Sequence, residues 1–368
     1  MRIINIIDSA DTINFGIWNS IIVNADVLIN EGIEVELWFP ESAIVDIKIP
    51  NARVANFSKE CLNQISKNRK LDSKRDLIVT HGAWRYPSRW GSLLKDRGFK
   101  WIYVPHGMLE PWPMQQKWLK KKIYFGLVEK RLVNKADLIR SVSLPEKENL
   151  QRIFPYSEIA FIPNGVSLDT QDPSTHYKNK DKKTYLFLSR LHHKKNIISL
   201  AEAWLASTIN NNADFELIIA GPDQGELQKL NDLLKHSSNM KYIGSVYGEQ
   251  KNEVFNKSDF YILPSFSEGL PSAMLEAMGF GLIPIITEGC NFPDAFIHNL
   301  GVKITTEKDS IRKTLEETSA WDRTIMHEKS NKNRDFIRLH YSINAITKMQ
   351  MELFNKILPP YSIAGDNN

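Results

Sequence analysis

The sequence lacks several features that would place it in other classes of protein. Only two of its 368 residues are cysteines, Cys61 and Cys290. They lie far apart, so they indicate no disulfide framework and fit a reducing compartment. No apolar run is long enough to span a bilayer, and no internal repeat or low-complexity tract is present. These absences argue against a disulfide-stapled, a membrane-spanning or a repeat protein.

The first residues and the overall charge argue against export and nucleic-acid binding. The opening stretch MRIINII predicts a β-strand rather than a signal peptide, because its apolar run is short and is broken by Asn5 and Asp8. We therefore expect a cytoplasmic protein. The net charge of +4 and the isoelectric point near 8.8 are only mildly basic, and they do not by themselves indicate a nucleic-acid partner.

The length and the pattern of apolar runs predict two α/β domains. A chain of 368 residues is too long for one ordinary core. Short apolar, β-branched runs alternate with longer helical patterns in both halves. This alternation predicts parallel sheets covered on both faces, in two doubly wound, Rossmann-like domains. The expected strands are Ile3–Ile7, Val35–Phe39, Leu77–Thr80, Trp101–Val104, Leu138–Ser141, Tyr185–Ser189, Leu217–Ala220, Tyr242–Ile243, Phe260–Leu263 and Ile283–Ile286.

A turn-rich stretch from Phe161 to Val166 separates the two sets of strands. Near the end of the chain, apolar residues recur with helical spacing, which predicts a last helix. These residues are Ile343, Ile346, Met349, Met351, Phe354 and Ile357. We assign residues 1–163 to a first domain, 164–341 to a second, and 342–368 to the final helix and a loose tail.

The stretch Tyr261–Ala277 carries the strongest functional signal. An apolar run ends at Pro264, a polar loop follows, and a helix is predicted to begin near Pro271. Glu268 lies in the loop, and Glu276 lies eight positions later in the helix. Such a junction directs backbone N–H groups and a helix dipole at one spot, where a nucleotide diphosphate fits. The two carboxylates can accept hydrogen bonds from sugar and ribose hydroxyls.

A second signal is the basic pair Arg190 and Lys195, which follows the strand Tyr185–Ser189. A guanidinium and an ammonium group in one loop can neutralise a departing diphosphate. The alternative is a solvated basic loop, the usual fate of such clusters. The downstream pair Glu268 and Glu276 favours the functional interpretation.

These segments resemble glycosyltransferase family 4. The two glutamates match its E-x7-E signature, Arg190 and Lys195 match its phosphate-binding segment, and the turn-rich Phe161–Val166 stretch resembles the linker that opens its second domain. The resemblance covers most of the chain. It implies the GT-B fold, with the two domains facing a central cleft and the last helix crossing back to the first domain.

The resemblance also implies roles for individual residues of the second domain. Arg190 and Lys195 would bind the donor diphosphate with Gly269 and Leu270, which stand at the helix start. Glu268 would contact the donor sugar near the reaction centre. The nucleoside would be held by Glu276 at the ribose and by the backbone of Val246 at the base. The family needs no divalent metal, and no Asp-x-Asp metal motif is apparent at a strand end, so we expect no cofactor.

Two features of the first half belong to the same hypothesis. His106 follows an apolar strand, which puts its imidazole at the carboxyl edge of a sheet, where open α/β domains bind ligands; the family carries a histidine there that faces the donor sugar. A structural histidine is the alternative, and we favour a structural role for His81. Gly16, in the loop expected after the first strand, would approach the donor diphosphate, although the family often has a glycine pair there. That loop holds no G-x-G-x-x-G, which argues against a nicotinamide dehydrogenase.

The segment 112–135 combines basic residues with aromatic ones. It contains Lys117, Lys120, Lys121, Lys122, Lys130, Arg131 and Lys135 among Trp112, Trp118, Tyr124 and Phe125. Such a mixture can lie on an anionic membrane, although a helix with one core face and one solvated basic face is the commoner explanation. We carry peripheral association with the inner face of the cytoplasmic membrane as a hypothesis.

The function expected from all of this is a retaining, metal-independent transfer of a hexose from a nucleotide sugar. The acceptor would be a hydroxyl of a saccharide or of a lipid-linked saccharide, in surface polysaccharide or glycolipid assembly. Two alternatives stay open: a non-catalytic scaffold that binds a nucleotide sugar, and a GT-B-like epimerase or phosphorylase. The motifs do not identify the sugar, the base, the acceptor or the oligomeric state.

Overall fold

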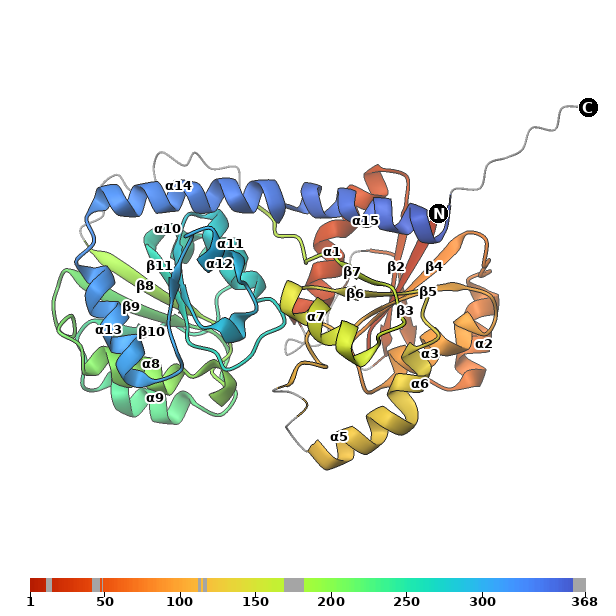
Figure 1. Ribbon diagram of the computed structural model, residues 1–368, viewed down its shortest axis with the longest axis horizontal. Coiled ribbons are helices and arrows are strands. Elements are labelled where there is room, and N and C mark those ends of the chain that lie inside the picture. The colour runs from red at the N-terminus through yellow and green to blue at the C-terminus, as the bar shows by residue number, and fades with distance from the viewer. Residues whose placement is uncertain are drawn as a thin grey trace, which may run out of the picture. The chain divides into compact units, whose positions relative to one another are not determined.

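The structure is a computed structural model that describes residues 1–10, 15–41, 47, 49–111, 114, 118–168 and 182–359. The chain divides into two compact units (Figure 1): Met1–Gly165 with Ile343–Asn368, and Val166–Ser342. The boundaries expected from the sequence, after residues 163 and 341, fall within two residues of these divisions. Each unit is described by itself below.

The first unit is built on a parallel sheet, which in the described residues has seven strands in the order β3-β2-β1-β4-β5-β6-β7. All residues of β1 and β4 are buried, as expected of parallel strands covered on both faces. The strands are β1 (Arg2–Ile6), β2 (Glu34–Pro40), β3 (Asn51–Val54), β4 (Asp76–His81), β5 (Lys100–Val104), β6 (Leu138–Ser141) and β7 (Ile159–Phe161).

Helices surround this sheet (Figure 1). Serine caps begin two of them: Ser58 accepts from the Cys61 N–H, and Ser143 accepts from the Glu146 N–H. The helices are α1 (Phe15–Asn30), α2 (Lys59–Asn68), α3 (Tyr86–Lys95), α5 (Trp118–Tyr124), the π-helix η1 (Phe125–Glu129), α6 (Lys130–Val133), α7 (Leu144–Ile153) and α15 (Ile343–Ile357).

The last helix, α15, belongs to the first unit and packs on α1. Its buried residues are Ile346, Thr347, Gln350, Leu353 and Phe354. The expected apolar face was therefore only partly right, because Met349 is exposed while two polar residues are buried.

The second unit has the same design. Its described residues form a six-stranded parallel sheet in the order β10-β9-β8-β11-β12-β13. The strands are β8 (Lys183–Leu188), β9 (Phe215–Ala220), β10 (Met240–Tyr242), β11 (Phe260–Leu263), β12 (Ile283–Ile286) and β13 (Val302–Lys303). The helices are η3 (His193–Lys195) and η4 (Glu288–Cys290), both 3₁₀, with α8 (Ile197–Leu205), α9 (Leu227–Leu234), α10 (Gly248–Lys257), α11 (Ser272–Gly279), α12 (Asp294–Ile297), α13 (Lys308–Ser319) and α14 (Arg323–His340).

Three edge strands were missed by the sequence prediction. They are β3, β7 and β13, which have four, three and two residues. An edge strand pairs on one side only and needs no long apolar run, so its sequence resembles that of a loop.

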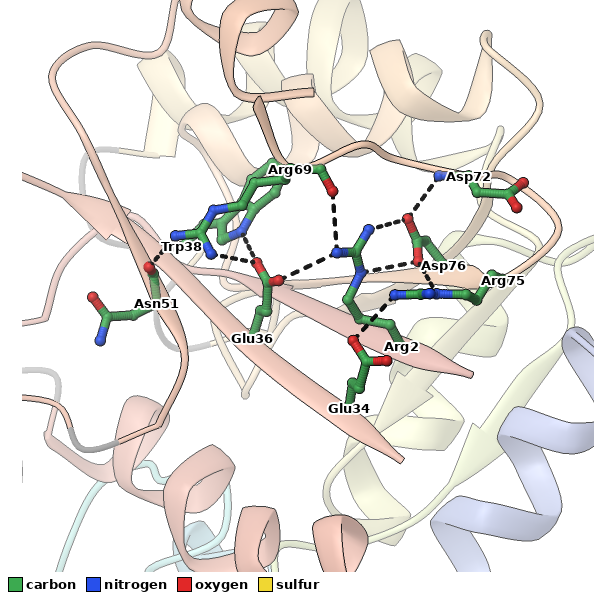
Figure 2. A network of polar contacts seen from close by, with 9 residues as sticks. All are labelled: Arg2, Glu34, Glu36, Trp38, Asn51, Arg69, Asp72, Arg75 and Asp76. Atoms are coloured by element: carbon green, nitrogen blue, oxygen red, sulfur yellow. Dashed lines mark hydrogen bonds and ion pairs between the residues drawn. The ribbon is translucent and has the colours of Figure 1, made fainter. Parts of the chain in front are cut away.

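A buried polar network joins the amino-terminal ends of β1, β2 and β4 (Figure 2). Arg2 donates to Asp76 through Nε at 3.0 Å and through Nη2 at 2.5 Å. Its Nη1 reaches Glu36 Oε1 at 3.4 Å, and Trp38 Nε1 donates to the other oxygen of Glu36 at 3.0 Å. Asp76 is fully buried, and Arg2 is its nearest compensating cation, with Arg75 Nε farther away at 3.7 Å.

Candidate active site

In the second unit, some of the expected site residues lie in the two loops where the strand order reverses: Arg190, Lys195, Glu268, Gly269 and Leu270. The sheet grows outward on both sides of the neighbouring strands β8 and β11. Their carboxyl ends lead into residues 189–195 and 264–271 respectively. In doubly wound sheets, ligands bind outside the carboxyl ends of the strands at such a point.

Lys195 and Glu268 form a buried ion pair at this position. Lys195 Nζ lies 2.6 Å from both carboxylate oxygens of Glu268. The two residues are only 7% and 8% exposed. Burial opposes ionisation of Glu268, but the charges of Lys195 and Lys194 outweigh it and lower the pKa of the carboxyl below its usual value. Both groups are therefore charged, and the pair places one cation and one anion side by side.

The loop that carries Glu268 is held by its own backbone. The Phe266 N–H donates to the carbonyl of Lys194 at 2.9 Å, and the Glu268 N–H donates to the carbonyl of Gly289 at 2.6 Å. Asn291 Nδ2 donates to the Glu268 carbonyl at 2.7 Å. A Cβ at Gly289 would lie 2.6 Å from the Phe266 carbonyl oxygen, so only glycine permits this approach.

Arg190 is half-buried in the loop after β8 and donates to Gln224 Oε1 at 3.2 Å. The loop lies against Gly221, which has a φ of +137°; a Cβ there would stand 1.9 Å from the Ser189 carbonyl oxygen. The glycine-rich turn after β9 thus has a packing role. Among the described residues, Arg190 forms no hydrogen bond or ion pair with Lys195 or Glu268.

The surroundings of this loop are electropositive. Burial, followed by the charges of His193, Arg190, Lys195 and Lys194, lowers the pKa of His192. A field that disfavours an extra positive charge on His192 favours a bound anion.

The start of α11 offers unused hydrogen-bond donors. The helix begins at Ser272 after Pro271, close to the expected position. Within the described residues, the backbone N–H groups of Gly269, Leu270, Ser272 and Ala273 have no protein acceptor. Together with the helix dipole, these groups can bind an anion.

Glu276, the residue expected to bind the ribose, has a side-chain partner in the structure. It is half-buried, and its Oε2 accepts from Lys251 Nζ at 2.6 Å. Lys251 lies on α10, and the sequence analysis missed it because no local pattern connects α10 to α11. Val246 has a buried side chain, while its backbone N–H and carbonyl have no partner among the described residues, which leaves both available for a base.

In the first unit, His106 lies just past β5, as expected, and the structure links it to His81. Its Nε2 is 2.9 Å from His81 Nδ1, and His81 Nε2 is 3.0 Å from Asn5 Oδ1. These three residues come from the carboxyl side of the neighbouring strands β5, β4 and β1. His81 thus contacts the candidate catalytic histidine directly, which the sequence analysis did not foresee.

Backbone geometry holds His106 in place. Both His106 and Gly107 have positive φ, +53° and +75°. The Gly107 N–H donates to the buried Glu146, which also accepts from the Val142 N–H at 2.7 Å. Burial, followed by the Arg140 charge, lowers the pKa of His106 to about 3, so its imidazole is neutral near pH 7.

Gly16 does not lie in a loop but in the first turn of α1. It is exposed, and a Cβ there would meet nothing within 4 Å, so the fold itself does not require glycine. The neighbouring Asn14 lies outside the described residues. A role of Gly16 at the donor diphosphate stays a prediction.

Comparison with solved structures identifies the architecture as GT-B, two Rossmann-like domains. Sucrose-phosphate synthase from Thermosynechococcus elongatus superposes with a TM-score of 0.76 at 14% identity, covering 97% of this chain and 99% of that one. Anabaena HepE in complex with UDP gives a TM-score of 0.76 at 15% identity, covering 97% and 100%.

Two family models match consecutive parts of the sequence. The model described as Glycosyltransferase Family 4 matches residues 16–170, and that described as Glycosyl transferases group 1 matches residues 169–333. The chain belongs to glycosyltransferase family 4.

Curated relatives match over part of their own length. The UDP-Gal:alpha-D-GlcNAc-diphosphoundecaprenol alpha-1,3-galactosyltransferase of Escherichia coli is 31% identical over 158 residues, which are 39% of each chain. The matched stretches span 38% to 60% of the lengths of the curated relatives.

Proposed function

We propose that this protein transfers a hexose from a nucleotide-diphosphate sugar to an acceptor hydroxyl, with retention at the anomeric carbon and without a metal. The buried Lys195–Glu268 pair carries the proposal, because it lies beside the unused N–H groups at the start of α11. That arrangement supplies cations and donors for a departing diphosphate and an acceptor for sugar hydroxyls.

The second unit would bind the donor. In the reaction, the bond from the anomeric carbon to the diphosphate oxygen breaks and a bond from the anomeric carbon to the acceptor oxygen forms, while the acceptor proton passes to an oxygen of the departing diphosphate. Arg190 and Lys195 would stabilise the charge that builds on the diphosphate, with the N–H groups of Gly269 and Leu270. Glu276 would accept from the ribose, and the Val246 backbone would contact the base.

Lys195 must then bind both Glu268 and the diphosphate. A diphosphate beside Lys195 competes with Glu268 for the three ammonium hydrogens. Glu268 would turn its freed lone pairs toward hydroxyls of the donor sugar. His106 would orient the sugar as a neutral hydrogen-bonding group, because its pKa of about 3 leaves it uncharged.

A lipid-linked saccharide is the acceptor class that we favour, in polysaccharide or glycolipid assembly. The Escherichia coli relative is named for transfer to a sugar on diphosphoundecaprenol. A non-catalytic nucleotide-sugar scaffold is the second candidate. It would bind the donor and release no nucleotide when acceptors are added.

The first experiment is a thermal-shift screen with UDP, GDP, ADP and their common sugar conjugates, followed by transfer to lipid-linked acceptors. A nucleotide that binds only the folded protein stabilises it by about 2.7 kcal/mol at a concentration of one hundred times its dissociation constant. We expect one base to raise the melting temperature. Absence of a shift with any nucleotide, in folded protein, would contradict the proposal.

Arg190→Ala is expected to lower kcat/KM for transfer on the order of 100-fold, because a cation facing the departing diphosphate is lost. The fold should be retained, since Arg190 is half-buried and its hydrogen bond goes to the side chain of Gln224. Initial rates and a melting curve check both parts. Lys229→Ala, which removes an exposed lysine from the same unit, is the control. An equal loss of kcat/KM in the two variants would show that Arg190 is not part of the donor site.

We also propose peripheral membrane association through the segment 118–131. Leu119, Ile123 and Leu127 are 55%, 53% and 59% exposed and are spaced four residues apart along α5 and η1. Lys122 and Arg131 are exposed on the same segment. Exposed apolar residues beside basic ones suit an anionic bilayer surface. Residues 112–113 and 115–117 of the expected segment lie outside the described residues. No helix in the described part of the chain combines the length and apolarity needed to cross a bilayer.

The double variant Ile123→Ser, Leu127→Ser is expected to weaken binding to vesicles that contain anionic lipid at least tenfold, because two buried contacts with the acyl region are lost. Sedimentation with vesicles measures this. Leu339→Ser removes a side chain that is 69% exposed on α14 and serves as control. Equal binding of the double variant and the wild type would refute the membrane proposal.

A further inference from the structure

A chain of hydrogen bonds runs across three strands and ends at His106. Asn5 Nδ2 donates to the Glu36 carbonyl at 3.2 Å, and Asn5 Oδ1 is 3.0 Å from His81 Nε2. His81 Nδ1 is in turn 2.9 Å from His106 Nε2. Asn5 and His81 are 6% and 3% exposed, so the chain is shielded from water.

The direction of each bond follows from its first member. The Glu36 carbonyl oxygen can only accept, so the amide nitrogen of Asn5 faces it and the Asn5 oxygen faces His81. An acceptor at that point requires the hydrogen of His81 to lie on Nε2. Burial, with the charges of His106 and Arg140, lowers the pKa of His81 well below its usual value, so the ring is neutral and Nδ1 carries a lone pair.

The same argument applies to the imidazole of His106. Because His81 Nδ1 accepts, the hydrogen of His106 must lie on Nε2. The neutral His106 ring then carries its lone pair on Nδ1. Among the described residues, this nitrogen has no hydrogen-bond partner. An atom without a partner is either buried or exposed to solvent, and this one is not among the buried atoms. It is therefore open to solvent at the carboxyl edge of the sheet.

We propose that Asn5 and His81 are positioning residues that lock His106 in its Nε2–H form, so that Nδ1 accepts a hydrogen bond from a sugar hydroxyl. This inference rests on the proposed function. It makes a definite statement about recognition: His106 accepts from the sugar and neither donates to it nor carries charge. A donor sugar without a hydroxyl hydrogen at that contact would be a poor substrate, including one with fluorine in its place.

Long-range ¹H–¹⁵N correlation of the full chain, labelled on histidine nitrogen, tests the inference without any turnover. His106→Gln and His81→Gln assign the two rings by loss of their signals. We expect both rings to be neutral and protonated on Nε2 in the wild type. In His81→Phe, we expect His106 to become a mixture of tautomers. A wild-type His106 protonated on Nδ1, or already mixed, would overturn the proposal.

Kinetics separate a positioning role from a merely structural one. His81→Phe is expected to lower kcat for transfer on the order of 100-fold, because misplacing a reacting group has effects of that size. Its affinity for the nucleotide should be unchanged, because the nucleotide contacts lie in the second unit. His236→Phe, at an exposed histidine of that unit, should match the wild type in both. Wild-type kcat in His81→Phe would refute the positioning role.

The two proposals can fail separately. A locked His106 tautomer in a protein that transfers no sugar would refute the proposed function and leave the tautomer assignment in place. A protein that transfers sugar while His106 is a mixture of tautomers would support the proposed function and refute the tautomer assignment. If His81→Phe does not fold, Asn5→Leu removes the acceptor of the His81 Nε2 hydrogen instead. The spectrum of the wild type decides the tautomer of His106 without either variant.

Discussion

Replacing Lys195 by methionine is expected to abolish sugar transfer, with kcat/KM falling on the order of 1,000-fold. The side chain is buried beside Glu268 at the carboxyl ends of β8 and β11, where a departing diphosphate would lie. Removing one preorganised donor from such a site costs roughly 3–4 kcal/mol of transition-state stabilisation. Initial rates at saturating acceptor measure the loss.

The same change is expected to destabilise the second unit by about 3–5 kcal/mol near neutral pH, because Glu268 becomes a buried charge without its partner. In the wild type, the lowered pKa of Glu268 contributes stability above the unfolded pKa, and this is lost as pH falls through the folded pKa. Without Lys195, burial raises the pKa of Glu268 above its unfolded value. Glu268 then destabilises the folded unit as the pH rises above the unfolded pKa. Urea unfolding should show a larger penalty at pH 8 than at pH 5.

The double variant Lys195→Met, Glu268→Gln separates stability from catalysis. With the carboxylate neutralised, much of the lost stability should return, while transfer should not. Glu268→Ala alone should also destabilise the unit, since it leaves the Lys195 ammonium buried. Transfer within tenfold of the wild type in Lys195→Met would show that the ion pair is structural and that the donor site lies elsewhere.

Replacing Arg2 by methionine is expected to lower the free energy of unfolding of the first unit by about 3–5 kcal/mol. In the wild type, the fully buried Asp76 receives two hydrogen bonds from Arg2, and Glu36 receives one (Figure 2). The variant loses all three. Unfolding in urea, followed by tryptophan fluorescence, measures the change. The second unit should keep its affinity for nucleotide.

The control for this prediction is a salt bridge of similar length at the surface of the same unit. Lys135 Nζ lies 2.8 Å from Asp96, and the two side chains are 43% and 53% exposed. Lys135→Met should cost less than about 1 kcal/mol, because water screens an exposed pair. Comparable losses in the two variants would contradict the claim that burial makes the Arg2 network important.

The central strands could be predicted from the sequence because burial on both faces leaves a continuous apolar run. Phe260–Leu263 and Ile283–Ile286 match the observed strands residue for residue. Leu138–Ser141 also matches, although only its first two residues are apolar. The edge strands β3 and β13 could not, because they lack such a run. The edge strand β7 is apolar, but it has only three residues and its last one, Phe161, begins the turn-rich stretch. The burial of Thr347 on α15 could not be predicted either, because it depends on α1, where Asn24 Oδ1 lies 3.5 Å from Thr347 Oγ1.

By itself, the sequence determined the family, the alternation of strands and helices, and the candidate site residues that follow the strands in loops or helices: Arg190, Lys195, Glu268, Glu276 and His106. Local patterns carry this information, because a strand, a loop and a helix start each occupy a few consecutive residues. The partners were decided only by the tertiary structure. Lys195 and Glu268 are 73 positions apart, and Asn5 and His81 are 76 apart. Parallel strands with helical crossovers bring such residues together, and no local pattern records which strands become neighbours.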